Sequence, residues 1–272
     1  ARELLRAAGG RSFLIAKIER AEAVGREAFE DILKASDGIM VARGDLAVEV
    51  GNASVPALQK RMLKMARAMD KVTITATQMM ESMIINPVPT RAEVSDVANA
   101  VHDGTDAVML SAETAAGKYP VETVEYMAQI CVEAERAEEV KLDADFTNKH
   151  FGRIDQAIAM GALFTAHHLG CKAILALTES GSTALWMSRY RSHTPIFGLT
   201  TQPVTLRRMA LYRNVRPILM ANHGERDEAL LDAEKILVER GVLRPGDTYA
   251  ITCGEPMGYP GGTNMLKVCR VA

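Results

Sequence analysis

The residues best suited to chemistry in this sequence close four apolar runs, and they are Lys17, Glu19, Asp45, Thr77 and Glu113. Two carboxylates without a histidine or cysteine partner favour a hard ion that prefers oxygen ligands. Glu19 and Asp45 therefore predict a Mg²⁺ or Mn²⁺ site with open positions for water and substrate oxygens. A lysine beside such an ion supplies a mobile positive charge for a phosphate or an enolate. Phosphoryl transfer needs little beyond positioning and charge neutralisation, so this set of groups suits it.

Strands and helices in regular alternation must bring these residues together. The apolar runs begin at Phe13, Gly38, Val72 and Ala107, so the unit repeats every 25, 34 and 35 residues, as a strand, a helix and two loops require. Between the runs, apolar residues recur at three- and four-residue spacing, which is typical of amphipathic helices. Functional groups at the carboxyl ends of parallel strands are the arrangement of a (β/α) barrel, so we expect an α/β fold with these groups at one rim.

Strand geometry explains why Lys17, Glu19 and Asp45 should lie close together. Lys17 and Glu19 are two residues apart, so their side chains leave a strand on the same face, and Asp45 on the next strand can meet Glu19 at a shared cation. A solvated ion pair at a strand end is the alternative interpretation of the lysine and its neighbour.

Other polar residues near these strands have structural interpretations. Arg43 is either catalytic or a brace for Asp45 or a neighbouring loop, and we leave it out of the catalytic set. Arg91 and Glu93 follow two prolines and open a helix, so a cap or a subunit contact competes with substrate binding. Glu113 points toward the rim, where we expect it to support the site and not to touch substrate.

The composition is typical of a globular enzyme and argues against two other classes. The chain has 272 residues, of which 48% are hydrophobic and 24% charged, and its 32 basic and 34 acidic side chains leave a net charge of −2. This balance gives no reason to expect nucleic-acid binding. No apolar stretch approaches the roughly 18–20 residues that a membrane span needs. Four cysteines lie in apolar runs without a Cys-x-x-Cys pair, so we expect buried thiols in a cytoplasmic protein.

Two domains are expected, residues 1–140 and residues 141–272, with a charge-rich connector at 136–151. The second is a smaller α/β domain. Its strand candidates are residues 173–178, 195–200, 215–220, 248–253 and 264–271, and its helix candidates are 155–170, 183–190, 203–212 and 226–241.

Four repeats cannot close an eight-stranded barrel. The first residues also resemble the interior of a helix that ends at Gly9 and Gly10. We therefore expect the chain to be the carboxyl-terminal part of a longer polypeptide, with barrel strands five to eight. Taken alone, it would expose strand edges and apolar core, and we expect it to be inactive or to need a partner.

Five motifs occur in the order and spacing of one enzyme family. They are AKIE (16–19), DGIMVARGDL (37–46), ATQMMESM (76–83), PTRAE (89–93) and SAET (111–114). Together they closely resemble pyruvate kinase. The resemblance continues in LTESG (177–181) and ALYR (210–213), so it covers essentially the whole chain.

The resemblance implies specific roles in moving the phosphoryl group of phosphoenolpyruvate to ADP, giving pyruvate and ATP in glycolysis. Lys17 matches the lysine that stabilises the phosphoryl group in flight, and Glu19 and Asp45 match the carboxylates that hold the divalent ion. Gly44 and Asp45 match backbone positions against the substrate carboxylate, where a side chain on Gly44 would block close approach. Thr77 matches a hydroxyl that contacts substrate and belongs to the route that protonates the enolate. The resemblance also implies K⁺, with ligands outside this chain, and a homotetramer.

A second site is expected in the second domain, between a strand and a helix, where backbone amides and hydroxyls can cradle a phosphate. The segment resembles the family's loop for a phosphorylated allosteric effector and comprises Thr178, Glu179, Ser180, Gly181, Ser182 and Thr183. The carboxylate of Glu179 would repel an anion unless it points away, and Ser182 stands where a basic residue is expected. The glycine-rich segment 258–263 could close over the same ligand, and an empty strand-to-helix turn is the alternative.

Two other functions fit part of the pattern. One is a Mg²⁺-dependent aldolase or lyase acting on enolpyruvate or pyruvate carbanions, which would release pyruvate without ADP. The other is a non-catalytic module that binds effectors and never turns over.

Overall fold

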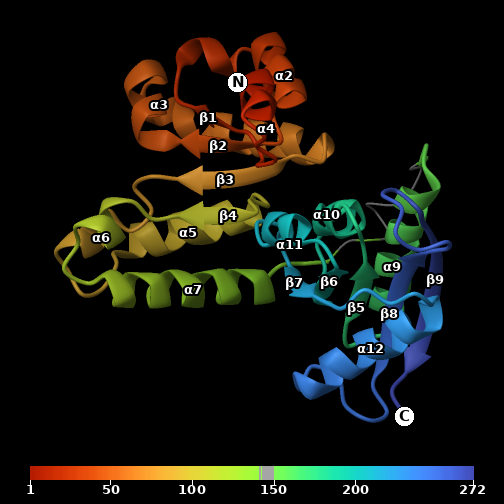
Figure 1. The fold of residues 1–272 in the computed structure, drawn as a ribbon. Coiled ribbons are helices and arrows are strands. Elements are labelled where there is room, and N and C mark those ends of the chain that lie inside the picture. The colour runs from red at the N-terminus through yellow and green to blue at the C-terminus, as the bar shows by residue number, and fades with distance from the viewer. Residues whose placement is uncertain (141, 143–149) are drawn as a thin grey trace. The chain divides into compact units, whose positions relative to one another are not determined.

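The computed structural model describes residues 1–140, 142 and 150–272. The chain divides into two compact units, Ala1–Glu138 and Glu139–Ala272. Each is built on its own sheet with helices beside it (Figure 1). Of the predicted connector, residues 141 and 143–149 lie outside the described residues.

The sheet of the first unit has four parallel strands in the order in which they occur along the chain. They are β1 (Ile15–Ile18), β2 (Gly38–Ala42), β3 (Val72–Ala76) and β4 (Ala107–Met109). All four predicted strands are therefore confirmed. The register pairs Ile18 with Val41 and Ala42 with Ala76, so the segments that follow β1, β2 and β3 leave along one edge of the sheet.

Helices and short 3₁₀ turns precede, connect and follow these strands. They are α1 (Arg2–Ala7), η1 (Ala21–Val24), α2 (Arg26–Ala35), α3 (Arg43–Val50), η2 (Asn52–Ser54), α4 (Val55–Ala68), η3 (Glu81–Ile84), α5 (Arg91–His102), α6 (Ala112–Ala115) and α7 (Pro120–Arg136). The segment between β1 and β2 is divided into η1 and α2, because Gly25 is extended and serves as the N-cap of α2. Helical segments lie between successive strands, and all four strands are parallel, as the repeat predicted.

Side chains of α2 and α4 form the core beside β1 and β2. Phe29 and Leu33 of α2 and Met62 of α4 are inaccessible to solvent, and Met65 and Met69 pack against the same cluster. Burying each such side chain contributes roughly 1.5–3 kcal/mol. This packing holds α2 and α4 against the strands that carry the candidate site.

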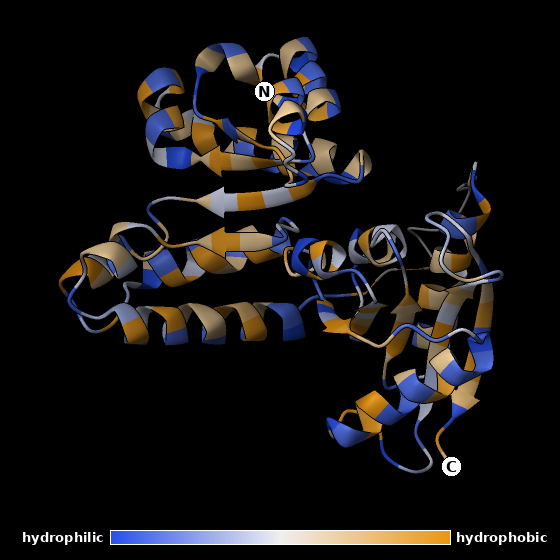
Figure 2. Cartoon of the chain, viewed as in Figure 1, coloured by the Kyte–Doolittle hydropathy of each residue, from blue (hydrophilic) through white to orange (hydrophobic). Residues whose placement is uncertain are grey.

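The apolar residues of α7 are only partly buried. Val121 and Val124 are 65% and 51% exposed, whereas Met127 and Ile130 pack into a cluster with the η3 region and α5. Figure 2 shows hydrophobic and hydrophilic bands alternating along this helix. The sequence carries apolar residues on two faces of α7, and tertiary packing selects one of them.

The second unit has a five-stranded sheet in the order β7-β6-β5-β8-β9, in which β9 is antiparallel to β8. Its elements are α9 (Ile154–His168), β5 (Ile174–Leu177), α10 (Ser182–Ser188), β6 (Ile196–Thr200), α11 (Pro203–Met209), β7 (Val215–Leu219), α12 (Arg226–Glu239), β8 (Thr248–Gly254) and β9 (Thr263–Arg270). Every predicted strand and helix of this unit is confirmed within a few residues. The chain builds outward from β5 to β7 and then returns to β8 on the other side, which makes a topological switch point between β5 and β8.

The four cysteines form no disulfide. Cys171 and Cys253 are buried as expected, and burial raises the pKa of each thiol. Cys131 and Cys269 are only partly buried. Within the described part of the chain, no helix combines the length and apolar character needed to cross a bilayer.

A capping box begins α5 and ties it to the η3 turn. The Thr90 side chain accepts from the Glu93 amide, and a Glu93 oxygen accepts from the Thr90 amide at 2.7 Å. The same carboxylate accepts from the Ser82 amide at 2.7 Å and from its hydroxyl at 2.6 Å. The interpretation of Glu93 as a cap is therefore confirmed.

The capping box predicts an acid-sensitive contribution to stability. Burial raises the pKa of the Glu93 carboxyl, but the hydrogen bonds from Ser82 and Thr90 outweigh burial and hold this pKa below its ordinary value. The contribution is thus complete above the unfolded-state pKa of about 4.3 and is lost as the pH falls through the lower folded-state pKa. We expect Glu93→Ala to lower the free energy of unfolding by about 1 kcal/mol at neutral pH.

Urea titrations at several pH values would measure this effect. Glu93→Gln is the matched variant, because its amide can keep part of the cap but does not titrate. Its unfolding free energy should fall less steeply with acid than that of the native protein. An identical pH dependence in both proteins would contradict this role of the carboxylate.

Candidate active site

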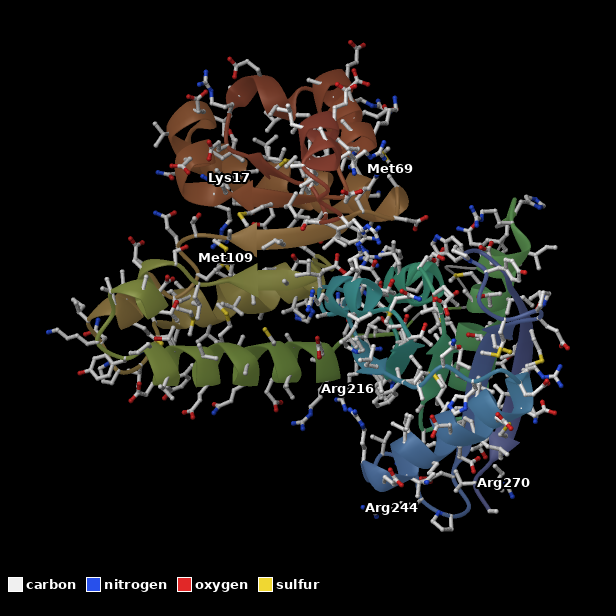
Figure 3. All side chains as sticks on the ribbon, in the orientation of Figure 1. Lys17, Met69, Met109, Arg216, Arg244 and Arg270 are labelled. Atoms are coloured by element: carbon white, nitrogen blue, oxygen red, sulfur yellow. The ribbon has the colours of Figure 1, made fainter. Side chains whose placement is uncertain are left out.

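The edge of the first sheet brings Lys17, Glu19 and Asp45 together. Lys17 is the third residue of β1, Glu19 follows that strand, and Asp45 lies in the first turn of α3 after β2. The lysine ammonium forms an ion pair with the Glu19 carboxylate and another, at 3.2 Å, with the Asp45 carboxylate. Figure 3 labels the lysine among the side chains of this unit. One cation is thus shared by acids from two neighbouring strands.

The two carboxylates stabilise the charged form of Lys17, and the lysine remains open to solvent. Hydrogen bonds to Glu19 and then to Asp45 raise the pKa of Lys17 above its ordinary value. The lysine is therefore a cation throughout the physiological pH range. Its side chain is 52% exposed, so an anion arriving from solvent can reach it.

The two carboxylates have the chemistry of a magnesium site. Glu19 Oε2 is inaccessible to solvent, and the lysine ammonium faces it. In the described residues, no group of three or more His, Cys, Asp or Glu side chains is placed to hold a metal. Mg²⁺ is commonly held by only one or two carboxylates, with water and substrate oxygens completing its shell. Glu19 and Asp45 fit that pattern.

Thr77 lies at the next strand end in a strained conformation. Its φ is 67° and that of Gln78 is 54°, so two consecutive residues with side chains occupy the left-handed region. Each such residue costs about 1–3 kcal/mol, and the cost is highest for β-branched side chains. The Thr77 hydroxyl donates to the Ala76 carbonyl at 2.7 Å and accepts from the Gly44 amide at 2.9 Å. The hydroxyl therefore has a defined position beside the start of α3.

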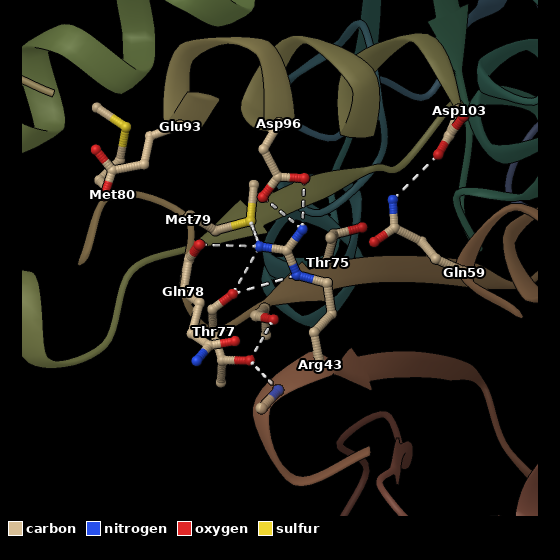
Figure 4. Close-up of polar contacts among 12 residues, drawn as sticks. Arg43, Gln59, Thr75, Thr77, Gln78, Met79, Met80, Glu93, Asp96 and Asp103 are labelled. Atoms are coloured by element: carbon tan, nitrogen blue, oxygen red, sulfur yellow. Dashed lines mark hydrogen bonds and ion pairs between the residues drawn. The ribbon is translucent and has the colours of Figure 1, made fainter. Parts of the chain in front are cut away.

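Arg43 braces the loop after β3, as one of its two predicted roles required (Figure 4). Its Nε and Nη2 donate to the Thr77 carbonyl at 3.2 and 2.7 Å, and Nη2 also lies 3.2 Å from the Gln78 carbonyl. The opposite side of the guanidinium pairs with Asp96 of α5 at 2.6 Å. Arg43 is only 8% exposed, and its side chain binds the loop and α5.

Glu113 does not lie open at the rim with the other acids. It is 2% exposed and accepts from the Met80 amide at 3.2 Å and from the Ser111 amide at 2.7 Å. The carboxylate thus joins the loops after β3 and β4. Its expected supporting role fits this position, because the carboxylate binds loop amides and does not lie open to solvent.

A second candidate site is a cavity of about 390 Å³ in the second unit. The residues that follow β5, β6, β7 and β8 line it, so it lies at the switch point of this sheet. From the predicted effector loop, the lining includes Thr178, Glu179, Ser182 and Thr183. The other two residues support the loop: Gly181 N donates to the Thr178 hydroxyl at 3.0 Å, and the Ser180 and Ser182 hydroxyls lie 2.9 Å apart.

The glycine-rich segment predicted to close over this ligand lines the same cavity at Gly258, Tyr259, Gly261 and Thr263. Thr263 is joined to Thr183 by a hydroxyl contact of 2.9 Å. No lysine or arginine is among the described residues that line the cavity. Any anion there would be held by hydroxyls and amides.

Comparisons with known proteins identify the family. The pyruvate kinase barrel-domain model matches residues 1–124, and the pyruvate kinase alpha/beta-domain model matches residues 156–269. The chain belongs to the pyruvate kinase family. It is 50% identical over 273 aligned residues to a pyruvate kinase of Buchnera aphidicola from Schizaphis graminum, covering 100% of this chain and 57% of that protein.

Other relatives agree. The chain is 48% identical to pyruvate kinase II of Salmonella typhimurium, covering 100% of this chain and 57% of the relative, and 47% identical to pyruvate kinase of Haemophilus influenzae, covering 99% and 56%. It therefore spans little more than half the length of these curated relatives. Its first unit belongs to the family's barrel domain and its second to the family's alpha/beta domain.

Sequence reasoning missed two features of these sites. None of the motifs contains Asp96, and its only sequence signal is a charge within helix α5. The segment after β7 was also missed, although His223 lines the cavity and forms a 2.9 Å contact with Asp232 of α12. A polar segment that directly follows a parallel strand could have indicated it.

Gly44 provides a test of whether the site is built for a ligand. A Cβ at this position would lie 3.6 Å from Thr77 Oγ1, which is an ordinary contact, so no described residue excludes a side chain. Gly44 also lies in the first turn of α3, where alanine is the better helix former. We expect Gly44→Ala to leave the free energy of unfolding unchanged or to raise it by about 0.5–1 kcal/mol.

Thermal or urea unfolding would measure that free energy, with ligand affinity measured on the same preparation. Weaker binding of a carboxylate ligand at unchanged stability would show that the missing Cβ serves the ligand. A variant that loses stability would show that the glycine is required by the fold.

Proposed function

We propose that this chain supplies one part of an enzyme that transfers the phosphoryl group of phosphoenolpyruvate to ADP, giving pyruvate and ATP. The observation that carries the proposal is the meeting of Lys17, Glu19 and Asp45 at one sheet edge in a member of the pyruvate kinase family. The curated relatives reported above are all named pyruvate kinase, so the aldolase or lyase and the non-catalytic module are not favoured.

Lys17 is the proposed catalytic cation. In the reaction, the bond between phosphorus and the enol oxygen breaks, and a bond forms to a terminal oxygen of the ADP β-phosphate. Negative charge is spread over the moving phosphoryl group, and an ammonium placed beside it stabilises the transition state. Because carboxylates on two sides hold the lysine, its position is set before substrate binds.

Glu19 and Asp45 are the proposed ligands of Mg²⁺ or Mn²⁺. When bound, the ion would neutralise phosphate charge and orient the reacting oxygens. The chain's own contribution is to present two carboxylates from neighbouring strands beside the lysine. We also propose a K⁺ requirement, as in the family, with the ligands outside this chain.

Gly44, Asp45 and Thr77 are proposed to hold and protonate the three-carbon part of the substrate. The Asp45 amide lies in the first turn of α3, where helix amides have no intrahelical acceptor, so it can donate to a substrate carboxylate. The missing side chain of Gly44 lets that carboxylate approach closely. The Thr77 hydroxyl is proposed to belong to the route by which the enolate carbon receives its proton and becomes the methyl group of pyruvate.

We further propose that β1–β4 are strands five to eight of an eight-stranded barrel. The open four-stranded sheet and the match to a little more than half of each relative support this assignment. Residues 1–140 would then complete the barrel and residues 141–272 would form the regulatory domain. As in the family, we propose a cytoplasmic homotetramer.

The first test separates this function from its alternatives. With the native full-length protein, we expect pyruvate to form from phosphoenolpyruvate only when ADP and a divalent cation are both present. A coupled assay for pyruvate, with and without ADP and with EDTA, measures this. Pyruvate released equally well without ADP would favour the aldolase or lyase, and no turnover under any condition would favour the binding module.

The second test concerns the lysine itself. We expect Lys17→Met to lower kcat by about 10²–10³-fold, because it removes a cation placed at the developing charge. Lys34→Met is the matched control, since Lys34 also pairs with two acids, Glu30 and Asp31, but does so on α2. Equal losses in both variants would show that the effect of Lys17→Met is not catalytic.

The cavity of the second unit is the proposed site for a phosphorylated allosteric effector, with Thr178, Glu179, Ser180, Gly181, Ser182 and Thr183 as the phosphate loop. Its volume and its place at the switch point support the proposal. The Glu179 carboxylate lies 3.4 Å from the Thr201 hydroxyl, which turns it toward β6 and gives it a partner within the cavity wall.

Thermal unfolding with a panel of sugar phosphates and nucleoside phosphates tests the effector site. A binder at 100 times its dissociation constant stabilises the folded state by about 2.7 kcal/mol. We expect Ser182→Asp to abolish that stabilisation by like-charge repulsion, while Ser54→Asp, on the exposed η2 turn of the other unit, retains it. The absence of a response to every phosphorylated compound would remove the proposal.

A further inference from the structure

We infer that Arg43 is a positioning residue for the protonation step, because its guanidinium holds the strand end that carries the Thr77 hydroxyl. The inference rests on the proposed function and adds to it a residue that the proposed set of catalytic and binding groups does not contain. Arg43 is joined through its own backbone to Gly44 and Asp45, and through its side chain to Thr77. One residue therefore connects the two strand ends that the substrate would contact.

The conformation of Thr77 needs an external support. Thr77 and Gln78 are both left-handed, an arrangement that persists only where surrounding groups hold it. Arg43 donates to the carbonyl oxygens of both residues, at 2.7 Å and 3.2 Å for its closest nitrogen. The left-handed backbone angles of Thr77 and Gln78 set the directions of these two carbonyl groups. The guanidinium thus binds the strained conformation itself.

The support is buried and has its charge balanced. Arg43 is 8% exposed, and its Nη1 pairs with Asp96 at 2.6 Å and 2.8 Å. Its Nη2 also lies 2.8 Å from the sulfur of Met79, which belongs to a buried cluster with residues of α5 and α7. Figure 4 shows the guanidinium between the loop carbonyls and the aspartate. The loop after β3 is consequently fixed to β2 on one side and to α5 on the other.

Only an arginine can make this set of contacts. The planar guanidinium offers five N–H donors in a fixed fork, whereas a lysine ammonium is a single compact charge. Four different groups surround Arg43 here, two carbonyls, a carboxylate and a thioether. A lysine at this position would keep the charge but would lose the simultaneous hold on both carbonyls.

The result of this hold is the position of one hydroxyl. With the Thr77 backbone fixed, its hydroxyl lies 2.9 Å from the Gly44 amide and 2.7 Å from the Ala76 carbonyl. The side chain of Arg43 contacts the loop after β3 and Asp96, whereas Lys17 pairs with Glu19 and Asp45. Replacing Arg43 should therefore spare the cation and metal groups. Its effect is therefore expected in proton transfer and not in divalent-ion binding.

The test follows proton transfer alone in the native full-length protein. Pyruvate is incubated in D₂O with Mg²⁺ and inorganic phosphate, and deuterium entering its methyl group reports deprotonation and reprotonation of that carbon. We expect Arg43→Lys to slow this exchange and kcat by about 30- to 100-fold, the scale of a displacement near 1 Å, with Mn²⁺ affinity within about twofold of the native value. Arg136→Lys, an exposed arginine at the end of α7, is the control and should change neither.

A double-mutant cycle decides whether Arg43 acts through the hydroxyl. Thr77→Val keeps a β-branched side chain and removes the oxygen, so adding Arg43→Lys to it should slow exchange no further than about twofold. If the double variant slowed exchange by the product of the two single effects, the inference would be overturned. An exchange rate within threefold of native in Arg43→Lys, or a parallel loss of its Mn²⁺ binding, would also overturn it.

Asp96→Asn provides a second measurement if Arg43→Lys does not fold. It keeps the carbonyl contacts of Arg43 but removes its counter-charge, and we expect exchange to slow by about three- to tenfold. An unchanged rate would overturn the inference. The exchange rate of the native protein in the same experiment tests the proposed function. The inference is tested separately, because it depends on the ratio of the variant's rate to the native rate.

Discussion

Parallel pairing of β1, β2 and β3 is the constraint on which the candidate active site depends. Register alone brings the segment after each strand to the same edge, so residues far apart in sequence become neighbours. A one-residue slip of β1 would turn Lys17 and Glu19 to the opposite face and separate them from Asp45. The buried helices α2 and α4 oppose such a slip, because Phe29 and Met62 would lose their packing.

Two cations at this edge illustrate different uses of charge. Lys17 is exposed and shared by two carboxylates, so it can exchange these partners for an arriving anion. Arg43 is buried and bound to four groups, and a buried charge without its partners would be costly. The exposed cation suits chemistry, and the buried cation suits the rigid support that chemistry needs.

The second unit follows the same rule with a different result. Its cavity also lies at the carboxyl ends of parallel strands, but hydroxyls, backbone groups and Glu179 line it in place of a cluster of charges. The change of direction between β5 and β8 opens a crevice there, since neighbouring connections diverge to opposite faces. Thr183 and Thr263, which lie 80 residues apart in sequence, meet across its wall. Topology creates the crevice and side chains give it its chemistry.

The sequence by itself determined the strands, most helices and the grouping of polar residues after each strand, because apolar periodicity and strand-end polarity are local properties. Only the tertiary structure decided the partners of Arg43, the burial of Glu113, the left-handed backbone of Thr77 and the exposed face of α7. These features depend on groups brought together from distant segments. Asp96, for example, lies 53 residues from Arg43, and no local pattern records that the two will meet.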